Sequence, residues 1–267
     1  DHLHIPDALE DTRLAMAKGN KILFEPAFEF DDVLVRVDIL DRLDNGSWHL
    51  IEVKSTTRVK DEHIHDVAIQ AYVLGGAEIK VGKTSLMHLN RECTYPDLSN
   101  LFTLEDISDQ VNVLMPALAT RVADFRQVVD MSEAPSIGVG RYCSSPYDCP
   151  FSASCWEGIP PVSMYSIPRL HEKKLIELAG KDITALEDIP EDYPLTNKQW
   201  EYVNFHKNRE VQVDWGTIRA ELDVLEYPLY FLDFETDSPA VPRLVGMHPY
   251  EQFPFQFSCH VLQEDGT

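Results

Sequence analysis

The spacing of hydrophobic and polar positions changes several times along the first 130 residues. Apolar side chains at helical intervals over residues 7–18, ending at Gly19, predict a helix. Short β-branched and aromatic runs follow, and they predict strands over residues 21–25, 27–30, 33–40 and 48–54. Asn45-Gly46, between the last two runs, is a strong signal for a hairpin turn.

Helical and strand patterns alternate after this hairpin. Residues 63–74 return to helical spacing, residues 84–90 have the pattern of a strand, and residues 103–129 predict one or two long helices. An antiparallel meander followed by helix, strand and helix indicates an α/β domain over residues 1–130.

The pattern is different beyond residue 130. Residues 131–162 are rich in Pro, Ser, Gly and Cys and lack periodicity, which predicts a stapled loop. Residues 163–225 are amphipathic and helical, and a strand-rich segment begins at Tyr227. We therefore expect a loop, a helical linker and a last part over residues 226–267.

Composition and charge restrict where the chain works and what it binds. Its 267 residues are 44% hydrophobic, and no run approaches the roughly 18–20 apolar residues of a membrane helix. Because the start also lacks a signal-peptide pattern, we expect a cytoplasmic protein with no membrane partner. The net charge of −22 counts against tight, nonspecific binding of nucleic acid through a basic face.

Both ends have the pattern of a chain that continues. The first residue is not Met, and residues 256–262 have the pattern of a strand before the turn-like Asp265-Gly266. We expect the last sheet to be unfinished at residue 267.

Asp38, Glu52 and Lys54 are the most informative polar residues. If the strands flanking the turn pair as a hairpin, Asp38 and Glu52 come opposite one another, and Lys54 shares a face with Glu52 because they are two residues apart. Two carboxylates supply the hard oxygen ligands that Mg²⁺ prefers, and a metal-bound water is a nucleophile for phosphodiester hydrolysis. A nearby ammonium stabilises the developing charge.

An ordinary edge hairpin with outward charges is the alternative interpretation. The surroundings favour the chemical one, because Asp38 interrupts an apolar run over residues 33–40 and Glu52 follows Leu50-Ile51. Carboxylates in such runs are half-buried, which is costly unless a metal or a cation compensates.

These residues resemble a known family. Residues 35–40 (VRVDIL), residues 51–55 (IEVKS) and a following helix with Gln70 are similar to the RecB-like branch of PD-(D/E)xK nucleases, which includes CRISPR-associated RecB-like exonucleases. The resemblance implies a restriction-endonuclease-like α/β core. It also implies Mg²⁺ or Mn²⁺ on Asp38 and Glu52, with Lys54 assisting the nucleophile and Gln70 in the catalytic site.

The chain departs from this family at several positions. Four residues after Gln70, where the family has Tyr, this chain has Leu74, and the nearest tyrosine is Tyr72. The family also uses a His or Glu from an upstream helix, which we expect before residue 1.

Three more residues near the predicted site have two interpretations each. Glu25 is a candidate extra metal ligand, and a solvated charge before Pro26 is an equally good interpretation. His63 and His65 flank the start of the predicted helix, and we interpret both as surface residues.

Three of the five cysteines, Cys143, Cys149 and Cys155, lie in the Pro-rich loop. In a cytosolic chain such clustering favours a metal site over disulfides, and thiolates in an irregular loop suit zinc or an iron–sulfur cluster. Three free thiols are the alternative. We interpret Cys93 and Cys259 as structural.

The family resemblance extends to these cysteines. Several RecB-like nucleases hold a 4Fe–4S cluster with three cysteines after the core and one before it, which implies such a cluster here, with Zn²⁺ as the alternative. Cys149 and Cys155 have the family spacing, whereas five residues rather than two separate Cys143 from Cys149. The fourth ligand is expected before residue 1.

The second half contains two further resemblances. Residues 164–190 predict two short helices around Ala179-Gly180, similar to helix-hairpin-helix modules that contact the DNA backbone, with a packing linker as the equal alternative. The apolar strand over residues 230–236 places Asp233 and Glu235 on one face, as in half of a two-metal site. It resembles the first motif of DEDD 3′–5′ exonucleases, whose fold is RNase H-like and whose later motifs would lie beyond residue 267.

The order of the parts also resembles a bacterial family known only as a domain of unknown function. Together these features predict a metal-dependent nuclease, and by analogy its substrate is nucleic acid, with single-stranded DNA or DNA ends expected. One alternative is a 3′–5′ exonuclease that trims RNA or DNA and whose main site includes Asp233 and Glu235. The other is an inactive acidic scaffold for a protein partner that the sequence does not identify.

Overall fold

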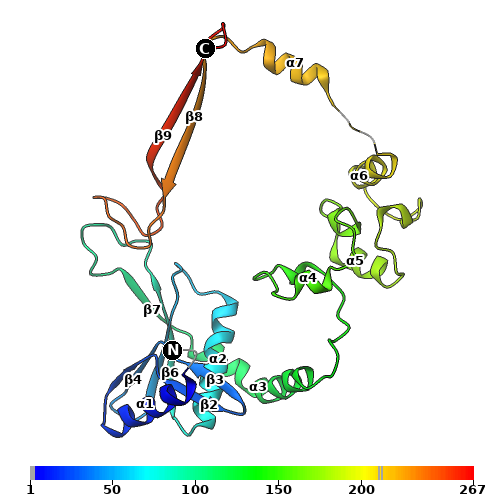
Figure 1. The fold of residues 1–267 in the computed structure, drawn as a ribbon. Coiled ribbons are helices and arrows are strands. Elements are labelled where there is room, and N and C mark those ends of the chain that lie inside the picture. The colour runs from blue at the N-terminus through cyan, green and yellow to red at the C-terminus, as the bar shows by residue number, and fades with distance from the viewer. Residues whose placement is uncertain (1–3, 210, 212) are drawn as a thin grey trace. The chain divides into compact units, whose positions relative to one another are not determined.

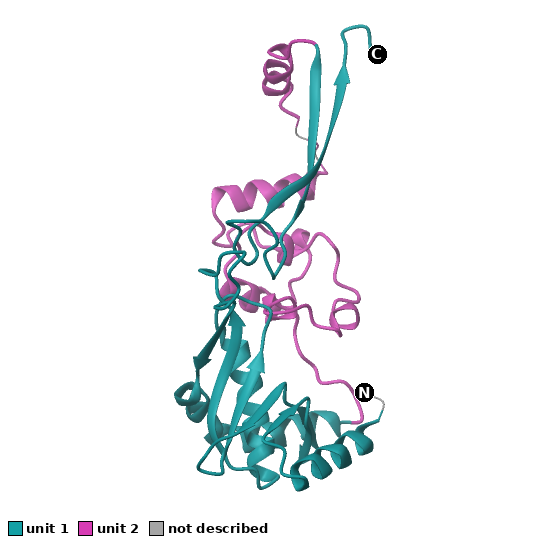
Figure 2. Ribbon diagram, turned by 90° about the vertical axis from the view of Figure 1, so that its left-hand side faces the viewer, with its two compact units in different colours: residues 1–131, 228–267 teal, residues 132–227 magenta. Residues whose placement is uncertain are grey.

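The computed structural model of the protein describes residues 4–209, 211 and 213–267; residues 1–3, 210 and 212 of the expected parts lie outside the described residues. The chain forms two compact units (Figure 2). Unit 1 combines residues 1–131 with residues 228–267, and unit 2 is residues 132–227. The chain therefore leaves unit 1, forms unit 2 and then returns, and most of the expected last part groups with the first.

A mixed sheet is the framework of unit 1. The described residues form a five-stranded sheet in the order β1-β4-β5-β6-β7. Its strands are β1 (Ile22–Phe24), β4 (Ile39–Arg42), β5 (Trp48–Val53), β6 (Val81–Leu89) and β7 (Phe102–Asp106). β5 and β6 are parallel, and such a pair needs a crossover, which α2 (Asp61–Gly76) provides. Sheet and helices together confirm the predicted α/β class.

Helix α2 packs on the sheet because its apolar residues repeat at helical intervals. Val67, Ala71 and Leu74 lie on one face of the helix and are buried. They belong to the same core cluster as Leu50 of β5 and Leu86 of β6, both fully buried. Burying each large aliphatic side chain contributes about 1.5–3 kcal/mol, so this contact holds α2 across the sheet.

The predicted strand over residues 33–40 is broken into two. β3 (Val33–Arg36) pairs with β2 (Ala27–Phe30) in a separate small sheet, whereas β4 begins at Ile39 and pairs with β1 and β5. Val37 and Asp38 connect β3 to β4 along the chain. Val37 is fully buried, and Asp38 is half-buried. The break therefore places Asp38 at the start of the hairpin that leads to Glu52.

The remaining helices of unit 1 are α1 (Ile5–Ala17) and α3 (Ser108–Val129), seen with α2 in Figure 1. The prediction of helix from residue 103 onward was wrong for its first residues, because Phe102–Asp106 is strand β7. This strand pairs with β6 from Leu89↔Phe102 to Ser85↔Asp106, and bonding to an open sheet edge outweighs the local pattern. No helix in the described part of the chain is both long and apolar enough to cross a membrane.

Unit 2 is helical and has its own small core. Its helices are α4 (Ser152–Cys155), α5 (Glu172–Ala179), α6 (Asn197–Asn208) and α7 (Trp215–Asp223), with short 3₁₀ turns η1 (Arg141–Cys143), η2 (Met164–Ser166) and η3 (Leu186–Asp188). Met164, Leu178 and Leu186 are almost fully buried in one cluster. Of the two helices predicted over residues 164–190, α5 forms the first, whereas the prediction of the second was wrong: after Ala179-Gly180 the chain forms only the 3₁₀ turn η3, which packs in the same cluster.

The returning segment of unit 1 forms a hairpin and a loop. β8 (Leu229–Asp237) and β9 (Phe253–Leu262) pair antiparallel, and most of their side chains are exposed. The loop between them docks on residues 89–101: Tyr95 N–H donates to the Met247 carbonyl oxygen at 3.0 Å, and Tyr250 packs against a cluster that contains the buried Cys93. Tyr250 Oη also donates to the Ser55 carbonyl oxygen at 2.7 Å, directly after Lys54.

Candidate active site

The carboxyl end of β5 places two of the predicted residues on the sheet face that α2 covers. Side chains alternate along a strand, so Glu52 and Lys54 share this face with Leu50. Glu52 is buried, with its side chain 9% exposed, and its Oε1 lies 2.8 Å from Lys54 Nζ. Its Oε2 accepts a 2.8 Å hydrogen bond from Gln70 Nε2 on α2. Both carboxylate oxygens of Glu52 are therefore held.

Asp38 joins this group through the backbone of β5. The β4–β5 ladder pairs Ile39 with Ile51, which brings Asp38 beside Glu52 just beyond the last pair. Asp38 Oδ2 accepts a 2.6 Å hydrogen bond from the N–H of Val53, the residue between Glu52 and Lys54. The structure thus brings together Asp38, Glu52, Lys54 and Gln70.

Asp66 is a member of this group that sequence reasoning missed. Its Oδ2 lies 2.9 Å from Lys54 Nζ, so Lys54 bridges Asp66 and Glu52. Asp66 and Gln70 are four residues apart on α2 and therefore lie on one face of the helix. This spacing, combined with the position of α2 after the strand, is the signal that could have found Asp66.

The ion pairs keep Lys54 charged. Burial on its own would lower the pKa of Lys54, but hydrogen bonds and charges from Glu52 and Asp66 outweigh burial and raise this pKa above its ordinary value. Lys54 is therefore an ammonium at neutral pH, in a position where 26% of its side chain is exposed.

Gln70 supplies the observation that tests the fit of a metal. The residue is 7% exposed, and its Oε1 has no hydrogen-bond partner in the described part of the chain. An unpaired buried acceptor costs about 1–3 kcal/mol, so this oxygen beside Glu52 fits a hard cation or its bound water. With the carboxylates of Asp38 and Glu52 the donors are all oxygen, as Mg²⁺ and Mn²⁺ require. Within residues 4–209, 211 and 213–267, no three His, Cys, Asp or Glu side chains form a ready metal-binding group.

Glu25 lies beside the group but its carboxylate is engaged elsewhere. Its N–H donates to the Asp38 carbonyl oxygen at 3.0 Å, which ties the two backbones together. Its Oε2 lies 3.5 Å from Arg36, and the residue is exposed with a left-handed φ of 53°.

The two histidines of α2 differ. The surface interpretation was wrong for His63, which is 3% exposed, because its ring folds back and its Nδ1 accepts a hydrogen bond from Lys60 N–H at the helix start. Burial lowers the pKa of His63, which makes it neutral at physiological pH. His65 is exposed, as predicted.

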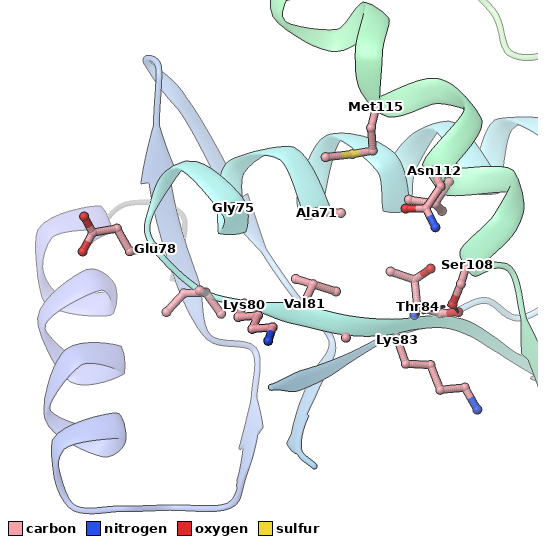
Figure 3. A pocket seen from close by; sticks show the side chains of 13 residues that line it. Ala71, Gly75, Glu78, Lys80, Val81, Lys83, Thr84, Ser108, Asn112 and Met115 are labelled. Atoms are coloured by element: carbon pink, nitrogen blue, oxygen red, sulfur yellow. Dashed lines mark hydrogen bonds between the residues drawn. The ribbon is translucent and has the colours of Figure 1, made fainter. Parts of the chain in front are cut away.

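Two cavities of unit 1 lie away from this group. One of about 460 Å³ lies between α2, β6 and the start of α3, with Thr84 and Asn112 directed toward it and Lys83 directed away (Figure 3). Another of about 670 Å³ lies between α1 and β1 and includes Glu25 and Arg36 in its wall. Neither is lined by Glu52 or Lys54, whose group is reached from the surface at Lys54.

The three loop cysteines lie close together in unit 2. Cys149 N–H donates to the Cys143 carbonyl oxygen at 2.7 Å, and Gly140 N–H donates to Cys143 Sγ at 3.5 Å. The pKa of Tyr142 is raised, mainly by burial and then by the nearby Cys143 and Cys155, so both cysteines lie near this tyrosine. Thiolates fit zinc or iron–sulfur chemistry, although the described residues do not assemble all three into a metal-binding group.

Asp233 and Glu235 lie on one face of β8, opposite Ser258 and Gln256 of β9. Both are exposed, and Asp233 Oδ1 accepts a hydrogen bond from the N–H of Phe234 at 3.0 Å. No hydrogen bond or ion pair described for the chain joins them to Asp38 or Glu52, so they form a separate acidic pair.

A short stretch of the chain matches a known family. Residues 230–267 match the family described as "Domain of unknown function (DUF2779)". No curated protein matches the chain. A solved structure described as "Crystal structure of SSO0001" is similar at 17% identity and a TM-score of 0.24, over 48% of this chain and 60% of that one. The chain therefore spans less than two thirds of that structure's length.

Proposed function

We propose that unit 1 is a metal-dependent nuclease with a PD-(D/E)xK core that hydrolyses phosphodiester bonds in DNA. The observation that carries this proposal is the convergence of Asp38, Glu52 and Lys54 at the end of β5. Lys54 Nζ forms an ion pair with Glu52 Oε1 at 2.8 Å, and the N–H of Val53 donates a hydrogen bond to Asp38 Oδ2 at 2.6 Å. The alternative of an ordinary hairpin with outward charges predicts an exposed Glu52, whereas Glu52 is buried.

Each residue has a distinct role in the proposed reaction. Asp38 and Glu52 would hold Mg²⁺ or Mn²⁺, and Gln70 fixes Glu52 through its Nε2, while its buried Oε1 has no hydrogen-bond partner among the described residues. When bound, such a cation would lower the pKa of a water that acts as the nucleophile and would supply positive charge for the phosphate. In this reaction the Lys54 ammonium, held beside Glu52, would stabilise the negative charge that develops on the attacked phosphate.

Single-stranded DNA or DNA ends are the proposed substrate, by the family resemblance alone. The net charge of −22 predicts weak binding of nucleic acid without a cation. We therefore expect the divalent cation to be needed for substrate binding as well as for cleavage.

The decisive experiment measures cleavage of end-labelled single- and double-stranded DNA with Mg²⁺, with Mn²⁺ and with a chelator. Lys54→Ala should reduce the cleavage rate by roughly 10²–10³-fold, as loss of a charge-stabilising group does. Lys83→Ala is the matched control, because Lys83 also pairs with an aspartate, Asp106 at 3.5 Å, but lies on the next strand and points away from α2 (Figure 3). Circular dichroism and thermal unfolding show whether each variant is folded.

Two outcomes would contradict this proposal. Cleavage that survives Lys54→Ala and is lost in Asp233→Ala would place the activity on β8, as a 3′–5′ exonuclease whose exposed acidic pair is Asp233 and Glu235. The absence of any chelator-sensitive cleavage would favour an inactive scaffold.

We further propose that Cys143, Cys149 and Cys155 bind a 4Fe–4S cluster, with Zn²⁺ as the alternative. The support is the shared position of their loop in unit 2 and the softness of three thiolates. Anaerobically purified protein should show a broad visible absorbance band that disappears in Cys149→Ser. A colourless protein with bound zinc would contradict the iron–sulfur assignment.

A further inference from the structure

We propose that Asp66 is a positioning residue that draws the Lys54 ammonium away from Glu52 when Glu52 binds a divalent cation. This inference rests on the proposed function, since it concerns the same group of residues. It adds a third carboxylate, which acts through Lys54.

The geometry gives Lys54 two alternative partners. Its Nζ lies 2.8 Å from Glu52 Oε1 and 2.9 Å from Asp66 Oδ2, so the ammonium is shared between two carboxylates at nearly equal distance. A small rotation of the lysine side chain would break one contact and keep the other. Lys54 can therefore leave Glu52 without losing its ion pair.

The two carboxylates differ in their freedom to move. Glu52 is 9% exposed and is fixed by Gln70 Nε2, whereas the side chain of Asp66 is 53% exposed. Glu52 is thus buried and held by a second residue, whereas Asp66 is exposed and Lys54 is its described partner. Because Asp66 and Gln70 lie one turn apart on α2, the same helix fixes Glu52 and offers the second position for Lys54.

A cation at Glu52 makes this second position necessary. An ammonium and a divalent cation on one carboxylate repel each other, and burial strengthens the repulsion. Asp38, Glu52 and Asp66 carry three negative charges against one positive charge on Lys54. The remaining two negative charges balance one divalent cation, and this balance includes Asp66.

An ordinary surface ion pair is the competing explanation of the Asp66 contact, since exposed pairs contribute little. The two explanations differ in what happens to metal affinity. If Asp66 forms only a surface ion pair, its replacement leaves the metal affinity unchanged. If Asp66 positions Lys54, its replacement lowers the metal affinity, but only while Lys54 is present.

The test is calorimetric titration of Mn²⁺ into the full chain without substrate, which reports binding independently of cleavage. Asp66→Asn should weaken Mn²⁺ binding by roughly 10–100-fold, the usual effect of losing a residue that orients a metal ligand. Asp66→Glu should restore most of the affinity. Glu62→Gln is the matched control, because Glu62 lies on the same helix and pairs with Lys60 at 3.4 Å.

A double-mutant cycle separates positioning from simple loss of charge. In the Lys54→Met background no ammonium competes for Glu52, so Asp66→Asn should cost much less affinity there than in the wild-type background. Equal losses in both backgrounds, or no loss in either, would overturn the inference.

Its failure is distinct from failure of the proposed function. Mn²⁺ binding that Asp38→Asn abolishes and Asp66→Asn weakens, in a chain that cleaves no DNA, would support the positioning role and contradict the nuclease. If DNA cleavage and Mn²⁺ binding both remain unchanged in Asp66→Asn, the nuclease is supported and the positioning role of Asp66 is contradicted. A chain with no Mn²⁺ binding that depends on Asp38 would overturn both.

Discussion

Gly75 and Gly76 are adjacent at the end of α2, but their surroundings differ. A Cβ on Gly76 would lie 2.1 Å from Cγ of Phe30, and this atom is too near the root of the side chain for ring rotation to relieve the clash. The Phe30 ring also packs edge-on against Tyr72, with centroids 5.5 Å apart. A Cβ on Gly75 would meet no described atom within 4 Å.

These two glycines give a prediction with its own control. Gly76→Ala should lower the free energy of unfolding by about 1–3 kcal/mol, because overpacking shifts Phe30. Gly75→Ala should raise it by roughly 0.5–1 kcal/mol, because alanine favours a helix. Urea denaturation of both variants measures the difference, and equal effects would show that Phe30 does not pack closely on α2.

Single residues also show which parts of the candidate site are readable from sequence. Asp38, Glu52 and Lys54 were identified because a hairpin turn and a two-residue spacing fix their relation locally. Asp66 was missed, and His63 was misplaced, because their surroundings depend on how α2 crosses β5. The ion-pair partner of a charged residue on a helix cannot be identified from sequence, because it depends on which strand the helix packs against.

At the scale of elements, the spacing of apolar residues predicted which segments are helix and which are strand. It did not predict the strand at the edge of the sheet. α2 and β5 were predicted nearly at their observed bounds, because strong periodicity and burial agree there. β7 was taken for helix, since this edge strand has one ladder partner and its residues are mostly exposed, so it lacks the buried alternation that marks a strand. The break between β3 and β4 was also missed, because apolar residues continue through Val37 while the chain changes sheets.

At the scale of the molecule, the returning segment is tied to the first part of unit 1. Met247 is 5% exposed, and its carbonyl oxygen accepts the hydrogen bond from Tyr95. His248 Nδ1 lies 3.0 Å from the Cys93 carbonyl oxygen. This attachment is next to Ser55 and therefore next to the end of β5.

We expect Met247→Ala to reduce the free energy of unfolding of unit 1 by about 2–5 kcal/mol, the usual range for a buried methionine. Val245→Ala, two residues away and 84% exposed, should change it by less than about 0.5 kcal/mol. Hydrogen exchange should show faster opening of residues 89–101 in the first variant alone. Protection that is unchanged there would mean that the docked loop adds no stability to this region.

The interruption of unit 1 by unit 2 has a consequence for biosynthesis. The ribosome releases residues 1–131 first, yet the surface around Leu89, Cys93 and Leu101 receives its cover from Ala240 and Tyr250, more than a hundred residues later. At ordinary elongation rates of about 5–20 residues per second, this apolar surface is bare for several seconds on every nascent chain. Unit 2, continuous in sequence and with a core of its own, is synthesised in full during that interval.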